Sequence, residues 1–252
     1  MAEQDLRLAG AEGYGIYGRL CSNGHRRLVI HIHGLTHHAR HLLEVTSSEF
    51  FEENGYDHYR VSLYERLPDS RKLHQSTLST HQSDIQTILD HFRKSYREIF
   101  ISAHSLGGLV ILMLNPQNVA AISLWDPSTD VTNYWATGPY LTHMPEQRQY
   151  QLDYGNVFVL SERMVEEIKL YPDEKGIDLA RSIKTPMQFV IPEESISLAS
   201  PRVAMEKYAE AFAGPFDLQR IPGANHVFSN RGNRQALFKA TLNWFNKHSG
   251  LF

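Results

Sequence analysis

Short apolar runs alternate with amphipathic stretches along most of the chain. Several of these runs end in Gly or Pro and are rich in Val, Ile and Phe, which is typical of strands buried on both faces. They fall at 27–34, 56–64, 98–105, 120–126, 186–192 and 216–223.

Between the runs, apolar residues recur at the spacing of a helix that buries one face. The first such stretch covers 39–55. The next begins at a capping-box pair, Ser79 and Gln82. Ser200 followed by Pro201 marks the start of another. Further helices are predicted at 106–115 and 233–248. Strands that alternate with helices in this way predict an α/β fold with a mostly parallel central sheet and helices on both faces.

The alternation is interrupted between the apolar runs at 120–126 and 186–192. This interval is rich in aromatic residues, and it contains a predicted hairpin at 149–160 and an amphipathic stretch at 161–171. Long insertions between core strands are often functional. We therefore expect a single domain over 1–252 that carries an inserted cap at about 127–185.

Composition narrows the class of protein. The 252 residues include 42% hydrophobic and 21% charged residues, with a formal net charge of -3, as in an ordered globular protein with no electrostatic preference for nucleic acid or an anionic membrane. Cys21 is the only cysteine, so no disulfide can form within the chain. The first ten residues lack the basic and apolar segments of a secretory signal, which predicts a cytoplasmic location.

The strongest local motif is SAHSLGG at 102–108, between a predicted strand and a predicted helix. A nucleophile elbow needs small residues around such a tight turn, and Ala103 and Gly107 satisfy this need. Ser105 would project at the carboxyl edge of the sheet. The backbone N–H of Leu106, in the first helical turn, would point toward an oxyanion.

A second motif, IPGANHVF at 221–228, places His226 on a late loop at the same edge. Histidine there can accept the proton of a serine hydroxyl, and a carboxylate would orient the imidazole. Three carboxylates are candidates for this acid. Glu194, after the run 186–192, is preferred, and Glu193 and Asp126 are the alternatives.

Together these motifs resemble the α/β-hydrolase superfamily over nearly the whole chain. The passage from SERMVEEIK at 161–169 to IKTPMQFVIPEES at 183–195 is similar to the cap-to-acid passage of small serine carboxylesterases, including those that act on acyl and cinnamoyl esters. HIHGLTHH at 31–38 looks like the superfamily's oxyanion loop, SAHSLGG like its elbow and PGANHVF like its histidine loop. The resemblance implies that Ser105 is the nucleophile, that His226 is the base, and that the backbone N–H groups of Leu35 and Leu106 form the oxyanion hole. The segment 64–73 and the acid loop depart from the superfamily's usual turns.

The five histidines of 31–41 raise the alternative of a metal site. Residues 35 and 36 do not supply the Asp and His of the familiar dinuclear spacing. No well-placed aspartate or cysteine completes a first coordination shell. We therefore predict no metal. Gly34, His37, His38 and His104 are instead candidates for the substrate pocket. The glycine-rich stretch at 13–18 is interpreted as a hairpin, because no helix is predicted after it.

The sequence thus predicts a carboxylesterase that needs no cofactor and acts on a small ester with an apolar or aromatic acyl group. One alternative is the same fold acting on an amide, a thioester or a lactone. Another is a homologue that binds a ligand without turnover. The sequence leaves the oligomeric state open.

Overall fold

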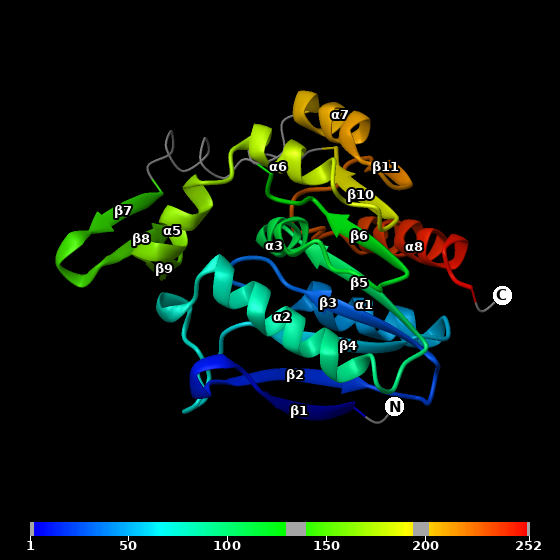
Figure 1. Ribbon diagram of the computed structural model, residues 1–252, viewed down its shortest axis with the longest axis horizontal. Helices are drawn as coiled ribbons and strands as arrows, with labels where there is room; N and C mark the ends of the chain where they lie inside the picture. Colours follow the sequence, from blue (N-terminus) through cyan, green and yellow to red (C-terminus); the bar gives the residue numbers. More distant parts are fainter. Residues whose placement is uncertain (1–2, 130–139, 194–201, 251–252) are drawn as a thin grey trace.

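A central eight-stranded sheet dominates the computed structural model, which describes residues 3–129, 140–193 and 202–250. The strand order is β1-β2-β4-β3-β5-β6-β10-β11; β1 and β2 pair antiparallel, β2 pairs antiparallel with β4, and the remaining neighbours are parallel (Figure 1). The strands are β1 (Glu3–Ala9), β2 (Gly15–Cys21), β3 (Arg27–Ile32), β4 (Asp57–Ser62), β5 (Glu98–His104), β6 (Ala121–Trp125), β10 (Met187–Pro192) and β11 (Phe216–Ile221).

Helices cover both faces of this sheet. On one face α1 and α8 share an apolar cluster, and on the other α2, α3, α6 and α7 share a second and larger one. Their bounds are α1 (Leu42–Glu53), α2 (Leu78–Phe92), α3 (Leu106–Leu114), α6 (Asp173–Ala180), α7 (Arg202–Ala211) and α8 (Arg231–Lys247). The predicted α/β architecture is confirmed.

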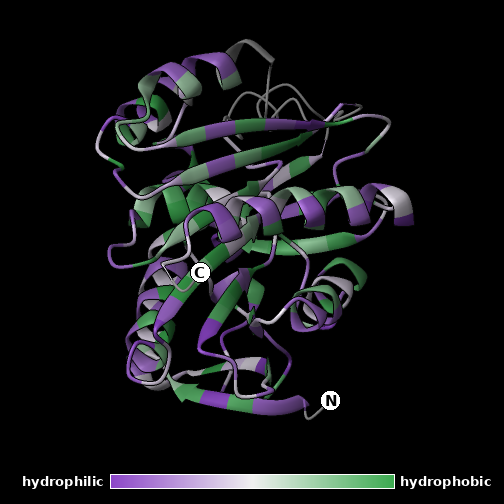
Figure 2. Ribbon diagram, turned by 90° about the vertical axis from the view of Figure 1, so that its right-hand side faces the viewer, coloured by the Kyte–Doolittle hydropathy of each residue, from purple (hydrophilic) through white to green (hydrophobic). Residues whose placement is uncertain are grey.

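Alternation along the central strands explains how both clusters form. In β3, Leu28 and Ile30 join the larger cluster, while Val29 between them joins the smaller one, and all three are fully buried. Successive side chains of a strand point to opposite faces, so a continuous apolar run supplies both layers at once. Figure 2 shows these central strands as mainly hydrophobic and the surrounding helices as mixed.

The insertion after β6 forms a separate small sheet. Its order is β7-β8-β9, all antiparallel, from β7 (Leu141–Met144), β8 (Gln149–Asp153) and β9 (Val157–Ser161), and α5 (Glu162–Lys169) follows it. The predicted hairpin and amphipathic helix are confirmed, whereas β7 was not predicted, because it is short and has no buried residue. Figure 1 shows this sheet on the side toward which β5 and β6 point.

Two predicted helix starts differ from the structure. Thr77, not Ser79, caps α2, through reciprocal hydrogen bonds with Thr80. Ser79 is the second residue of α2, where its N–H and hydroxyl both donate to the Glu167 carboxylate of α5. Ser200, the other predicted cap, lies outside the described residues. Among the described helices, none combines the length and the apolar character needed to cross a bilayer.

Candidate active site

Ser105 occupies the tight turn between β5 and α3. Its backbone has φ 53° and ψ −122°, a strained conformation for a residue with a side chain. The N–H of Ser105 donates to the carbonyl of Trp125 at 3.0 Å. A Cβ on Gly107 would approach the carbonyl oxygen of His33 to 2.7 Å, so glycine is required where α3 passes the end of β3. The turn therefore holds the serine hydroxyl clear of the sheet's edge.

Three side chains from distant parts of the chain meet at this turn. The Oγ of Ser105 lies 3.0 Å from Nε2 of His226, and Nδ1 of His226 lies 2.5 Å from Oδ2 of Asp126. Asp126 is fully buried, whereas the His226 side chain is 32% exposed. With Nδ1–H donating to the carboxylate, Nε2 is free to accept the serine proton, which is the arrangement of a nucleophile with an oriented base.

The carboxylate beside His226 is therefore not the one that the sequence favoured. Asp126 follows β6, the direct neighbour of β5, and its φ of 41° belongs to the left-handed region that Asp and Asn tolerate best. Glu193, after β10, is exposed, and its Oε2 accepts from the N–H of Gly223 at 3.4 Å. Glu194 lies outside the described residues. Of the three predicted candidates, Asp126 is the one that the described structure brings to His226.

His104 supports the loop that carries His226. Its Nε2–H donates to the carbonyl oxygen of His226 at 2.8 Å, and the two rings lie 4.8 Å apart. Burial holds the pKa of His104 well below its usual value, with a further contribution from His226. The side chain is 1% exposed. His104, predicted as a candidate for the substrate pocket, thus lies buried against the loop of His226.

The loop after β3 is fastened against Ser105. His33 donates from Nδ1 to the carbonyl oxygen of Gly34 at 2.7 Å and accepts at Nε2 from the N–H of Leu63 at 3.0 Å. Burial lowers the pKa of His33 to about 4, so the ring is neutral at pH 7 and can both donate and accept. A Cβ on Gly34 would lie 2.9 Å from Cβ of Ser105. Glycine is therefore needed where this loop meets the serine.

The two predicted oxyanion donors lie close together. Leu35 and Leu106 line the same small cavity, together with Gly34 and Gly107. The N–H of Leu106 belongs to the first turn of α3, where no intrahelical acceptor is available. Leu35 and Leu106 thus lie near each other, next to the two glycines that adjoin the Ser105 turn.

The other histidines of this loop are placed differently from one another. The His37 side chain is 11% exposed and lies between His41 and His104, at ring separations of 3.7 and 5.5 Å. His38 is exposed and accepts the N–H of Arg40. Of the two predicted pocket histidines, only His37 packs toward the buried residues of the site.

Ser128 was not predicted and lies beside the nucleophile candidate. Its Oγ is 3.3 Å from that of Ser105, and its N–H donates to the carbonyl oxygen of Ser105 at 3.0 Å. The residue is 6% exposed. Its sequence neighbourhood, DPST, held only a turn signal, so the contact depends on the fold.

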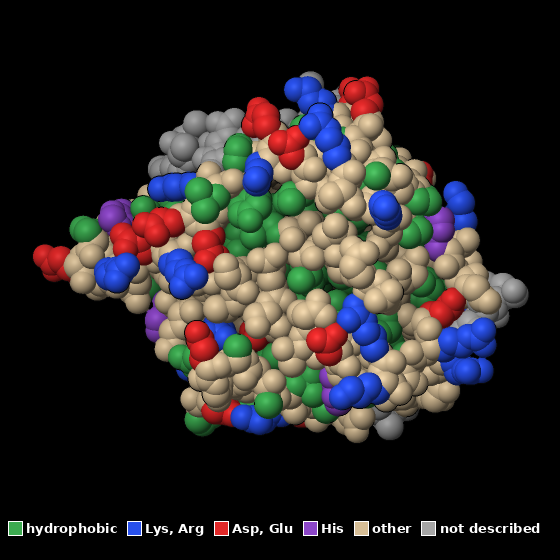
Figure 3. All heavy atoms as spheres, viewed as in Figure 1, with side chains coloured by type: hydrophobic (Ala, Val, Ile, Leu, Met, Phe, Trp, Pro, Cys, Tyr) green, Lys and Arg blue, Asp and Glu red, His purple; other side chains and the backbone are tan. Residues whose placement is uncertain are grey.

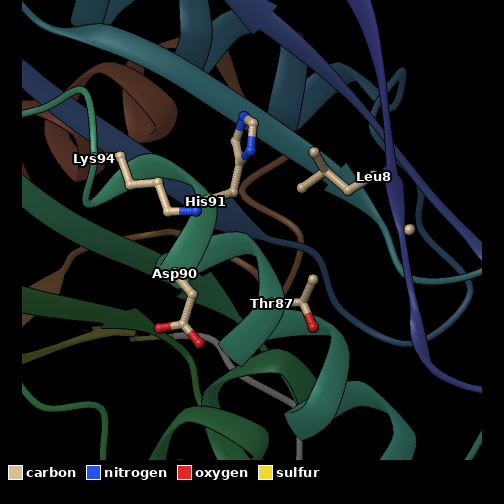
Figure 4. A pocket seen from close by; sticks show the side chains of 6 residues that line it. Leu8, Thr87, Asp90, His91 and Lys94 are labelled. Atoms are coloured by element: carbon tan, nitrogen blue, oxygen red, sulfur yellow. The ribbon is translucent and has the colours of Figure 1, made fainter.

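A separate hollow lies between β1 and α2, far from these residues in the sheet order. It is lined by Leu8, Ala9, Thr87, Asp90, His91 and Lys94 (Figure 4). None of the side chains around Ser105 contributes to it. This hollow is therefore not part of the candidate active site around Ser105.

No family model and no curated protein sequence matches the chain, so its similarity to known proteins is seen in the structure. Est1E from Butyrivibrio proteoclasticus with ferulic acid bound superposes with a TM-score of 0.80 at 20% identity, over 96% of this chain and 98% of that one. The esterase domain of a Rhodothermus marinus protein gives 0.75 at 16% identity, over 98% and 99% of the two chains. A monoacylglycerol lipase from Paleococcus ferrophilus gives 0.69 at 16% identity, over 93% and 99%.

The chain has the α/β-hydrolase fold. In the α/β-hydrolase fold the nucleophile, acid and histidine follow one another along the chain, and Ser105, Asp126 and His226 have this order. The insertion between β6 and β10 lies between the last two of them. The α/β-hydrolase fold alone does not assign an activity.

Proposed function

We propose that this protein hydrolyses carboxylic esters through an acyl-enzyme intermediate on Ser105. The observation that carries the proposal is the continuous hydrogen-bonded chain from Ser105 through His226 to the buried Asp126. A serine hydroxyl becomes an effective nucleophile only when a base removes its proton. The His226 ring, which Asp126 holds in place, is positioned to be that base.

In the acylation step, Nε2 of His226 takes the Ser105 proton as Oγ attacks the ester carbonyl carbon. The negative charge on the former carbonyl oxygen is stabilised by the N–H groups of Leu35 and Leu106. His226, now an imidazolium held by Asp126, gives the proton to the leaving alkoxide. The alcohol departs and the acyl group remains on Ser105.

Deacylation repeats these steps with water as the nucleophile. His226 takes a proton from water, the hydroxide attacks the acyl carbon, and the proton returns to Ser105 as the acid leaves. In both steps Asp126 orients the His226 ring and stabilises the imidazolium.

We further propose an apolar or aromatic acyl group. Three observations support this choice. Ferulic acid, an aromatic acid, is bound by the structural neighbour Est1E. In the described part of the insertion, Tyr140 and Tyr154 lie 5.5 Å apart by ring centroid and are exposed. Figure 3 shows hydrophobic side chains gathered between α3, α5 and α6, on the face seen in Figure 1.

The test uses a fluorophosphonate probe and a panel of feruloyl and short aliphatic p-nitrophenyl esters. We expect wild type to be labelled and to turn over esters, and Ser105→Ala to do neither. Ser102→Ala, which removes a buried serine on the same strand, should still be labelled. Absence of labelling in folded wild-type protein would refute the nucleophile. Equal rates for all acyl groups would refute the aromatic preference alone.

A further inference from the structure

A buried carboxylate lies beside the oxyanion loop within a group of histidines. Glu44, in the first turn of α1, is fully buried. Its Oε1 lies 3.1 Å from Nδ1 of His37, and its Oε2 lies 3.1 Å from Nδ1 of His41. Separations of about 3.3 Å are what a metal ion at 2.0–2.1 Å imposes on neighbouring tetrahedral ligands. One ligand atom from each of the three residues lies within 4.8 Å of the other two, so a small adjustment of the side chains would bring them to these separations.

A third histidine points at the same carboxylate from β3. His31 is fully buried, and its Nε2 has no hydrogen-bond partner in the structure, yet this atom lies 3.9 Å from Oε1 of Glu44. Its Nδ1 is 2.8 Å from the hydroxyl of Ser102. A histidine fixed through one ring nitrogen, with the other directed at a carboxylate, has the orientation that metal-binding histidines usually show.

We propose that His37, His41 and Glu44 bind a divalent transition-metal cation of the Zn²⁺ type, with His31 supplying or orienting the fourth position. Two imidazole nitrogens and one carboxylate oxygen form a ligand set that Zn²⁺ accepts and that Mg²⁺ does not favour. The inference is independent of the proposed esterase activity.

Proton balance is simple at this site. A neutral histidine that donates from Nδ1 to Glu44 must move that proton to Nε2 before Nδ1 can bind a cation, with no net release. A protonated histidine must instead lose one proton to solvent. Metal binding here therefore weakens as the pH falls.

This site was not predicted from the sequence, because the histidines lack the familiar dinuclear spacing and no Asp or Cys lies at a suitable position near them. The missing carboxylate is Glu44, three residues after His41, in the pattern H-x₃-H-x₂-E. Since α1 begins at Leu42, its first turn brings Glu44 back over the loop. The loop is short and tied at both ends, because the N–H of His37 donates to Gly34 and that of His41 donates to His38.

A cation at this position would fix the loop that carries Leu35. His37 also contacts His104, whose Nε2–H holds the His226 loop. His104 thus connects the metal-ligand candidates to the loop of His226. Ser105, His226 and Asp126 are not themselves among those candidates. We expect metal binding to raise the thermal stability of the whole protein, since a ligand that binds only the folded state stabilises it.

The experiment titrates the full chain, first stripped with a chelator, with Zn²⁺ and separately with Mg²⁺. Calorimetry and thermal unfolding are the readouts. We expect one Zn²⁺ per chain with a rise in Tm, and no such response to Mg²⁺. His41→Gln should weaken Zn²⁺ binding at least about tenfold, because it removes one of three ligands.

The matched control is His143→Gln. His143 also contacts a carboxylate, at 2.8 Å from Oε1 of Glu162, and its side chain is 41% exposed against 39% for His41. His143→Gln should bind Zn²⁺ as wild type does. Since Glu44→Gln risks misfolding at a buried position, the partly exposed His41 carries the test. Co²⁺ in place of Zn²⁺ should give visible absorption that His41→Gln alters.

Three outcomes would overturn the proposal. The first is wild type that binds no Zn²⁺ below millimolar concentration. The second is equal Zn²⁺ affinity in His41→Gln and wild type. The third is a loss of binding in His143→Gln as large as in His41→Gln, which would indicate scattered surface binding.

Discussion

Two neighbouring strands of the sheet, β6 and β10, end in loops that are both acidic but are built differently. Asp126 after β6 is fully buried and contacts His226 at 2.5 Å, whereas Glu193 after β10 is exposed and accepts a hydrogen bond from the N–H of Gly223 at 3.4 Å. The backbone of each residue is hydrogen-bonded to the next strand. The N–H of Asp126 donates to the carbonyl oxygen of Val190, and the N–H of Glu193 donates to that of Ile221. The difference lies in the side chains.

Burial distinguishes the carboxylate that contacts His226 from the one that does not, although both follow strands that end at the same edge of the sheet. A buried charge costs free energy unless it is paired and hydrogen-bonded, so its geometry is fixed by its partners. An exposed carboxylate is stabilised by water and has no such constraint. The predictions below test whether the buried side of this edge carries the chemistry.

The largest effect is expected from Asp126→Asn. Asparagine tolerates the same left-handed backbone but cannot stabilise the His226 imidazolium, so kcat for ester hydrolysis should fall by roughly 10³–10⁴-fold. Steady-state kinetics on the esters that wild type cleaves will measure the loss.

Glu193→Gln is the matched change on the exposed loop and should leave kcat within about twofold, since it alters only a solvated carboxylate. If Glu193→Gln causes the large loss while Asp126→Asn keeps its rate, the assignment of the acid is wrong.

The next effect is expected from Gly34→Ala. The added Cβ would lie 2.9 Å from Cβ of Ser105 and 3.0 Å from Nδ1 of His104, so the loop must shift. Displacing an oxyanion donor costs about 10²-fold in kcat, with a smaller change in KM. Gly250→Ala meets nothing closer than 3.5 Å and should behave as wild type. If kcat is unchanged in Gly34→Ala, this loop does not contribute to catalysis.

A third effect is on stability below neutral pH. Burial lowers the pKa of His33 to about 4, below the value near 6.5 of the unfolded chain. The neutral ring's contribution is therefore complete above pH 6.5 and is lost as the pH falls toward 4. Between pH 7 and pH 5 this costs about 2 kcal/mol of unfolding free energy.

Urea denaturation at several pH values measures this slope. His33→Gln should be less stable at pH 7 but should lose about 2 kcal/mol less between pH 7 and pH 5. The exposed His74 serves as control, because His74→Gln should leave the slope unchanged. Burial lowers the pKa of His81 to about 3, so His81 also makes the unfolding free energy depend on pH. Part of this pH dependence should therefore remain in both variants. If the unfolding free energy of His33→Gln falls between pH 7 and pH 5 by as much as that of wild type, the prediction is wrong.

The smallest effect is expected from Ser128→Ala. Its hydroxyl lies 3.3 Å from that of Ser105, and one neutral hydrogen bond is worth about 1 kcal/mol. We expect kcat to fall about fivefold, as measured on the same esters. Ser229→Ala, an exposed serine of the histidine loop, should show no loss.

Sequence patterns predicted the elements well where burial follows a simple period. The runs that became β3, β5, β6 and β10 are apolar on both faces, and the turn residues around Ser105 are informative locally. The cap at Thr77 was missed because Ser79 offered a similar spacing and only tertiary contact with Glu167 explains Ser79.

The site was harder to predict where partners come from different elements. Every parallel strand ends at the same edge, so spacing along the chain cannot decide which carboxylate reaches His226. Asp126 has a φ of 41°, and although Asp tolerates this left-handed region, the residue type alone does not reveal that conformation in the sequence. Ser128 and Glu44 were missed for the same reason, since each acquires its contacts only when neighbouring segments pack.

The pairing of β5 with β6 has a consequence for how a working molecule is assembled. Ser105 and Asp126 follow adjacent paired strands, and the N–H of Ser105 is bonded to Trp125, so these two groups are brought together early along a growing chain. His226 comes 100 residues after Asp126, beyond β11. A nascent or truncated chain that ends before β11 would hold the serine and the aspartate without a base, and would be inert toward esters until the last segment is added.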